Sequence, residues 1–202
     1  MPKVKLTKNE LKKQRDDLQR FSRYLPTLQL KKQQLQLETR LARQEMRELE
    51  NQEKSYRRQL EDWIYLLDEV SASELADLIK VEEWRTGSRN IAGVDTPVFE
   101  DLLFEDPELD LFETPPWYDD AIEAVRQLEV FRLRHQILEA RLEALEDELR
   151  TTTQRVNLFE KVKIPEAQEN IRRIQIYLGD QQTAQVGRAK IAKRKTEALR
   201  AS

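Results

Sequence analysis

The chain has 202 residues, with 35 basic and 38 acidic side chains, four glycines, one histidine and no cysteine. Four glycines are too few for the turns of a β-sandwich or barrel, and none has the spacing of a phosphate-binding loop. The lack of cysteine excludes disulfides, thiolate metal sites and cysteine nucleophiles. No apolar run approaches the roughly 20 residues that cross a bilayer, and the N-terminus lacks an apolar signal-peptide core. We therefore expect a soluble, intracellular, mostly helical chain.

Charge is distributed unevenly along the sequence. Residues 1–60 carry a net charge of +8, residues 61–123 a net charge of −16, and residues 124–202 a net charge of +5. Such a basic–acidic–basic order indicates three regions with different surroundings. We predict an N-terminal coiled-coil helix over 1–68, an acidic insert over 69–120, and a C-terminal coiled-coil helix with a protruding basic tip over 121–202.

The first region carries a heptad pattern. Steps of three and four residues from Leu11 to Leu67 meet apolar side chains at thirteen of seventeen positions. A narrow apolar seam sustained over eight heptads is typical of a coiled coil. Thr7 followed by Glu10 predicts a capping box at its start. Pro26 lies inside the run and predicts a kink.

The last region repeats the pattern from Ala121 to Phe159, where ten of twelve positions are apolar. Two steps of four then lead from Phe159 to Ala167 past Pro165, which is a stutter that locally unwinds a supercoil. From Gln181 onward the seam positions become small or polar. The predicted core residues of both helices are Leu18, Phe21, Leu25, Leu28, Leu35, Met46, Leu49, Leu60, Leu128, Leu138, Leu142, Leu145, Leu149, Val156 and Phe159.

The insert between them has a different pattern. Ser71–Lys80 predicts a short helix with a serine N-cap. The segments Lys80–Arg85 and Asn90–Val94 flank Thr86–Arg89, which predicts a small β-hairpin with its turn at Thr86–Arg89. Four prolines interrupt the acidic remainder.

Two long helices joined by about 50 residues predict an all-α fold, a long antiparallel two-helix coiled coil with a small irregular insert. If Leu67 lies opposite Ala121, paired residue numbers add to about 188, so Leu6 faces Gln182. Residues beyond about 188 then project alone by roughly 20 Å. This register brings the two basic ends together at one tip.

The sequence offers little catalytic material, and we predict no catalytic, cofactor or metal site. His135 lies on the seam, where a packed or register-setting role is expected. The acidic cluster from Glu100 to Glu113 lacks the alternating ligands and glycine of a calcium loop, so a solvated face is expected. The basic stretch Gly187–Lys195 could contact nucleic-acid phosphates, but no aromatic side chain interleaves with it.

Several segments form a recognisable pattern. One set of positions lies in the last region: Arg155, Val156, Asn157, Glu160, Ile164, Pro165, Ile171 and Ile174. The other segments are Lys5–Leu11, Leu25–Lys32 and Asn90–Val94. Together they resemble the D subunit of V/A-type rotary ATPases in its bacterial branch. The resemblance covers the whole chain, and the order and spacing of the matching segments agree.

The resemblance implies a non-catalytic central rotor shaft with no cofactor of its own. Its paired terminal helices would enter a hexameric head of catalytic and regulatory nucleotide-binding subunits. Its middle would contact the small F subunit of the rotor, for which we expect Met46–Leu60 with Phe131–Leu145, and dock toward a socket subunit above the membrane ring. ATP hydrolysis or synthesis would be coupled to proton or sodium transport. The chain would be cytoplasmic and peripheral to the inner (plasma) membrane.

For the head contact we expect a set of basic residues near the tip, namely Lys5, Lys8, Lys12, Lys190, Lys193, Arg194 and Lys195. The alternative function is a non-motor helical-hairpin scaffold or adaptor. A nucleic-acid-binding coiled coil is a third class, which rests on the basic tail alone.

Overall fold

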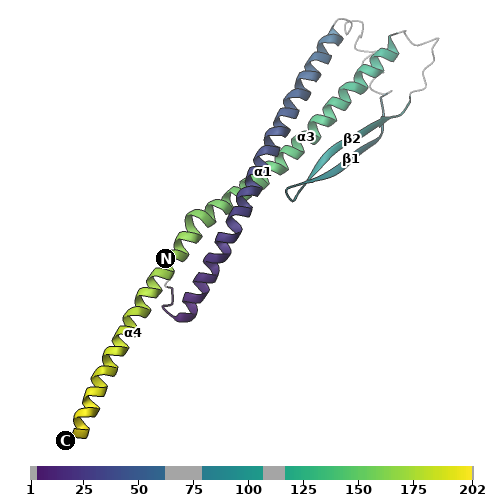
Figure 1. Ribbon diagram of the computed structural model, residues 1–202. Coiled ribbons are helices and arrows are strands. Elements are labelled where there is room, and N and C mark those ends of the chain that lie inside the picture. Colours follow the sequence, from purple (N-terminus) through teal and green to yellow (C-terminus); the bar gives the residue numbers. More distant parts are fainter. Residues whose placement is uncertain (1–3, 62–78, 107–116, 202) are drawn as a thin grey trace. The chain divides into compact units, whose positions relative to one another are not determined.

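The computed structural model describes residues 4–61, 79–106 and 117–201 (Figure 1). The chain divides into two compact units: a terminal unit of Met1–Lys31 with Thr152–Ser202, and a central unit of Lys32–Thr151. The elements in chain order are α1 (Lys8–Glu61), β1 (Val81–Ile91), β2 (Val94–Phe104), α3 (Tyr118–Leu158), a π-helix and α4 (Ile164–Ala201). The fold class is mainly α with one antiparallel β-hairpin, as predicted. The expected boundary at residue 68 and most of the expected short helix at Ser71–Lys80 lie outside the described residues.

Helix α1 begins where the capping box predicts. Thr7 Oγ1 accepts the backbone N–H of Glu10 at 3.3 Å, and this bond satisfies one of the amides that a helix start leaves open. The helix contains Pro26 in its interior and continues to Glu61. The predicted kink at Pro26 stays a prediction.

The predicted stutter is a π-helix, Phe159–Lys163, between α3 and α4. The N–H of Ile164 donates to the carbonyl of Phe159, five residues back rather than four. Pro165 has no N–H to donate, and its ring would crowd the carbonyl four residues earlier in a regular α-helix. A widened turn just before the proline relieves that crowding, so the irregularity begins at Phe159.

In the central unit, α1 and α3 pack against each other and against the tip of the β-hairpin. Leu35 and Leu145 are fully buried, and they form one cluster with Ala42 and Ile91. A second cluster joins Leu49 to Phe131 and Leu138, with Met46 and Tyr56 at its edge. The ring centroids of Tyr56 and Phe131 lie 5.9 Å apart. The hairpin runs alongside α3 (Figure 1).

Polar contacts between α1 and α3 show the antiparallel register in this unit. Arg43 bonds Glu146 at 2.7 Å, Arg141 bonds Glu45 at 3.1 Å, and His135 lies 3.7 Å from Glu50. The two residue numbers of these pairs add to 189, 186 and 185, close to the predicted 188.

The turn of the β-hairpin lies at Ala92–Gly93, so the prediction of a turn at Thr86–Arg89 was wrong. Ala92 and Gly93 have φ angles of 52° and 80°. Positive φ at both central residues defines the two-residue turn whose twist suits a hairpin. The side chain of Asn90 closes the turn by accepting the N–H of Gly93 at 3.1 Å and donating to Asp95 at 2.6 Å.

Gly87, which suggested the other turn, lies inside β1 opposite Val98. A Cβ atom at this position would overlap the carboxylate of Glu100. The exposed carboxylate of Glu100 thus lies close over Gly87, which belongs to a strand and makes no chain reversal.

In the terminal unit, the first part of α1 packs on the end of α3 and the start of α4. The rings of Phe21 and Phe159 stack with centroids 5.3 Å apart, and Asn170 donates to Gln14 at 3.4 Å. Between these two contacts the position on α1 moves back by seven residues, from 21 to 14, while the position on the partner helical segment moves forward by eleven, from 159 to 170. The four extra residues match the predicted stutter. Val156, Ala167 and Ile174 are buried in this unit.

Candidate interaction surfaces

The basic residues expected to contact a partner at the tip are all exposed in the terminal unit. Lys5 lines a groove between the start of α1 and the start of α4, and Glu166 and Asn170 line the same groove. Lys193, Arg194 and Lys195 lie on α4, where Lys193 is 3.8 Å from Glu197, one helical turn on. Lys5 therefore lies near the start of α4, whereas Lys193, Arg194 and Lys195 lie near its end.

The register at this end differs from the expected one. The pairs Phe21–Phe159 and Gln14–Asn170 add to 180 and 184 rather than 188, and Leu6 shares a groove with Ile174 and Tyr177 rather than facing Gln182. The prediction assumed one constant offset along both helices, whereas stacked rings and the π-helix set the offset locally. Every residue from Gly179 to Glu197 is exposed. The unpartnered part of α4 thus begins about ten residues earlier than expected and extends for about 30 Å.

The family-signature positions lie at the junction of α3 and α4. Val156 is buried and Ile164 is half-buried, whereas Arg155, Asn157, Glu160 and Pro165 are exposed. Glu160 belongs to the π-helix and Pro165 follows its end. The signature therefore marks the irregular turn together with one core position on each side of it.

The fifteen predicted core positions divide into two groups by exposure. The buried ones are Leu35, Leu49, Leu60, Leu138, Leu145 and Val156. The half-buried ones are Leu18, Phe21, Leu25, Leu28, Met46, Leu128, Leu142, Leu149 and Phe159. Partial exposure is expected of a two-helix seam, because two helices cannot enclose a side chain on all sides.

An apolar groove of about 950 Å³ lies in the terminal unit between the N-terminal residues and α4. Val4 and Leu6 line one wall, and Val162, Ile176 and Tyr177 line the other. Val162 and Ile176 are about half exposed. The end of the chain therefore presents an apolar surface as well as a basic one.

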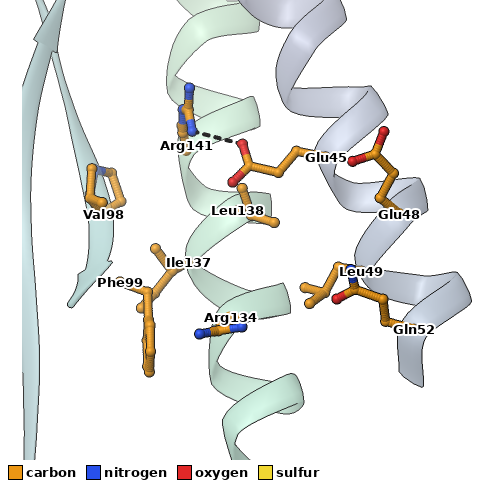
Figure 2. Close-up of a pocket in the computed structure, with 11 residues that line it drawn as sticks. Glu45, Glu48, Leu49, Gln52, Val98, Phe99, Arg134, Ile137, Leu138 and Arg141 are labelled. Atoms are coloured by element: carbon orange, nitrogen blue, oxygen red, sulfur yellow. Dashed lines mark hydrogen bonds and ion pairs between the residues drawn. The ribbon is translucent and has the colours of Figure 1, made fainter. Parts of the chain in front are cut away.

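A second cavity, of about 310 Å³, lies in the central unit between α1, α3 and β2 (Figure 2). Its apolar walls are Leu49 of α1, Ile137 and Leu138 of α3, and Val98 and Phe99 of β2. Arg141 closes one end, where it bonds Glu45 and lies 3.9 Å from Glu38. Arg134 lies toward the other end, facing Phe99 (Figure 2).

Two arginine–phenylalanine contacts connect β2 to α3. The guanidinium of Arg134 lies 5.1 Å from the ring centre of Phe99, and that of Arg126 lies 5.4 Å from the ring centre of Phe104. Arg126 also donates to the backbone carbonyl of Glu105 at 2.6 Å. Neither contact was predicted from the sequence. The two arginines are eight residues apart, about two helical turns, so the sequence could have placed them on one face of the helix. The sequence of the helix does not show which β-strand packs against that face.

Two groups in the central unit have shifted pKa values. Burial, with a smaller contribution from the charge of Glu123, raises the pKa of the Tyr56 hydroxyl above its usual value. On the exposed face of β1, the hydrogen bond and charge of Arg85 lower the pKa of Glu83. His135 is half-buried beside Glu50 and lies on the seam as expected.

The described parts of the chain hold neither a metal-ligand cluster nor a membrane-spanning helix. No three His, Cys, Asp or Glu side chains gather there as metal ligands. None of the helices in those parts combines the length and apolar character of a bilayer span. Of the acidic cluster, Glu100, Asp101, Glu105 and Asp106 are exposed, and the rest lies outside the described residues.

Comparison with known proteins identifies the family of the chain. The family model for the D subunit of ATP synthase matches residues 10–194. The chain belongs to the ATP synthase D subunit family. The V-type ATP synthase D subunit of Borreliella burgdorferi is 46% identical over 193 residues, covering 96% of this chain and 95% of the relative. The D subunits of the V-type ATP synthases of Chlamydia felis and Chlamydia pneumoniae are 34% and 35% identical, and cover 96% and 98% of this chain and 94% and 95% of their own.

These matches confirm the resemblance to the D subunit of the V/A-type ATPases. They extend over both units and through the β-hairpin, so the family assignment does not rest on the coiled-coil pattern alone, which unrelated helical proteins share. The family places the chain among the components of an ATP synthase.

Proposed function

We propose that this D subunit is the central rotor shaft of a V/A-type rotary ATPase. Rotation of the shaft would couple ATP hydrolysis or synthesis in a hexameric head to proton or sodium transport through a membrane ring. The chain itself would be non-catalytic, would bind no nucleotide, and would be cytoplasmic and peripheral to the inner membrane. The observation that carries this proposal is the near full-length match to the D subunits of V-type ATP synthases.

The structure supports a mechanical role in each unit. Two antiparallel helices packed along an apolar seam resist twisting more than a single helix does. Twisting one helix against the other would have to break the buried apolar clusters and the ion pairs between the helices at the same time. A shaft that turns must also avoid being held at one angle. Exposed cations suit such a contact, since surface ion pairs contribute about 0–1 kcal/mol each.

The partners follow from this proposal. The terminal unit, with its basic tip and apolar groove, would face the head of alternating catalytic and regulatory subunits. The central unit would contact the small F subunit of the rotor and the socket subunit above the membrane ring. Nucleotide state would couple to rotation through differences in these contacts, since a ligand shifts a conformational equilibrium only by its differential affinity.

The deciding experiment is affinity purification of the tagged chain from gently solubilised membranes, followed by mass spectrometry and an ATPase assay. We expect two nucleotide-binding head subunits in about threefold excess over this chain, with ATP turnover. Recovery without the head subunits would contradict the rotor and favour the scaffold. A salt-dependent mobility shift with nucleic-acid probes would instead favour the third class.

A further inference from the structure

The cavity between α1, α3 and β2 has one uncompensated cation at its edge. Arg134 is exposed, its guanidinium lies over the ring of Phe99, and among the described residues it makes no hydrogen bond or ion pair. The other arginine of the cavity, Arg141, is paired with Glu45 and Glu38. Glu48 of the lining keeps its negative charge, because the hydrogen bond that it accepts at 2.9 Å comes from the neutral amide of Gln44, but it lies on α1, across the cavity from Arg134 (Figure 2).

Arg134 carries hydrogen-bond donors that suit a carboxylate. The planar edge of a guanidinium matches the two oxygens of a carboxylate and can donate two parallel hydrogen bonds to them. Contact with the ring of Phe99 restricts the conformations of the free side chain, so less conformational entropy is lost on binding. Among the described residues, these donors of Arg134 have no acceptor.

The cavity is small, and an apolar floor lies between polar walls that include Glu45, Glu48 and Gln52. Leu49, Ile137 and Leu138 are buried at its floor, and Val98 lines the strand side. A volume of about 310 Å³ is at the lower end of the range for small-molecule cavities, roughly 300–1,000 Å³. One large apolar side chain fits such a space, and arginine is enriched among the residues that contribute most to binding energy at protein interfaces.

We propose that this cavity is the docking site of a segment from a partner protein in which an apolar residue adjoins an aspartate or glutamate. The apolar side chain enters between Leu49, Val98 and Leu138, and the carboxylate accepts hydrogen bonds from the N–H groups of Arg134. This inference rests on the proposed function only in taking the partner from the same complex. It assigns the β-hairpin a role, since β2 supplies both the ring and one wall of the site.

The first test uses the isolated full-length chain labelled with ¹⁵N-arginine and the probe N-acetyl-Leu-Asp-amide. We expect a saturable shift of the Arg134 Nε–H resonance on titration. N-acetyl-Leu-Asn-amide should bind about tenfold more weakly, because it lacks the charge that strengthens the hydrogen bond. Equal binding of the two probes, or no saturable shift, would overturn the proposal.

Matched variants locate the site. Arg134→Gln should abolish the preference for the aspartyl probe. Arg132→Gln should retain it, because Arg132 lies outside the cavity and pairs with Glu129 at 2.8 Å. Phe99→Leu keeps an apolar wall but removes the aromatic ring beneath Arg134, so we expect intermediate affinity. Loss of the preference in Arg132→Gln would contradict the assignment to Arg134.

The second test repeats the titration with the purified complex. If a partner segment occupies the cavity, the aspartyl probe should no longer shift Arg134 in the complex. A cavity that still binds the probe in the complex would overturn the assignment to a partner there. Failure of the proposed function is distinguishable, since it appears as absent head subunits in the purification and leaves the isolated-chain titration unaffected.

Discussion

Leu35 shows how much a single core position contributes. It is fully buried between α1, α3 and the hairpin tip, whereas Leu37, two residues later on the same helix, is 52% exposed. Leu35→Ala should lower the free energy of unfolding by about 2–5 kcal/mol, through lost burial and the cavity left behind. Leu37→Ala, the control, should change it by less than about 0.5 kcal/mol. Urea unfolding followed by circular dichroism measures both, and similar losses would contradict this packing.

Tyr56 gives the central unit a dependence on alkaline pH. Its pKa is raised in the folded chain, chiefly by burial, so the neutral hydroxyl is favoured when folded. Its contribution is therefore fully present below the unfolded pKa of about 10 and is lost as pH rises through the folded value. Tyr56→Phe cannot ionise but keeps the contact with Phe131. Over roughly pH 9 to 11, the variant should lose less stability than the parent chain, as measured by urea unfolding. Parallel curves would refute the assignment.

The β-hairpin depends on its turn. Gly93 has a φ of 80°, which an L-residue adopts at a cost of about 1–2 kcal/mol. Gly93→Ala should therefore weaken the hairpin by about that amount and raise the rate of amide hydrogen exchange across β1 and β2. The exchange of the α1 amides serves as the internal control. Unchanged exchange in the strands would mean that the turn does not determine hairpin stability.

The glycines of α4 should behave in the opposite way. Gly179 and Gly187 are helical, and a Cβ at either position would meet nothing within 4 Å. Gly179→Ala with Gly187→Ala should raise the helicity and stability of the isolated chain, by about 1 kcal/mol per site in a helix interior. Thermal melting followed by circular dichroism measures the change. A lower melting temperature of the isolated chain would contradict the observation that nothing lies near these two glycines. If a partner packs closely against Gly179 and Gly187, the same variant should assemble less well into the complex.

The long periodic elements could be predicted from the sequence, and the hairpin turn could not. Heptads, the Thr7 cap and the stutter before Pro165 are local patterns, and each corresponds to an observed feature. The turn failed because Thr-Gly-Ser resembles a turn, whereas positive φ at Ala92 is set by strand pairing that a single sequence does not display. The partners of Arg134 and Arg126 are likewise tertiary. Such contacts join residues that lie far apart in the sequence on different elements, and they have no periodicity of their own.

The acidic and basic segments of the sequence belong to different units of the molecule. The acidic residues of the insert that the structure describes lie on and beside the hairpin of the central unit, and the basic tail lies on α4 of the terminal unit. The seam needs neither set of charges. Many of these side chains are exposed and can make contacts outside the chain, as the proposed function would require of each unit.

Reversal of charge at the tip tests the proposed head contact directly. The triple change Lys193→Glu, Arg194→Glu and Lys195→Glu removes three exposed cations and places a like charge one turn from Glu197. Since each surface pair contributes about 0–1 kcal/mol, we expect affinity for the head to fall about tenfold or more, and less so at high salt.

A charge-conserving triple, Lys193→Arg, Arg194→Lys and Lys195→Arg, is the matched control and should assemble as the parent chain does, because a rotating contact that relies on net charge is insensitive to the exact cation. The readout is ATP-driven rotation of the purified complex, together with the yield of head subunits. Normal rotation of the reversed variant would reject the assignment of these three residues. It would then direct attention to the apolar groove around Ile176 and Tyr177, which the reversal leaves intact.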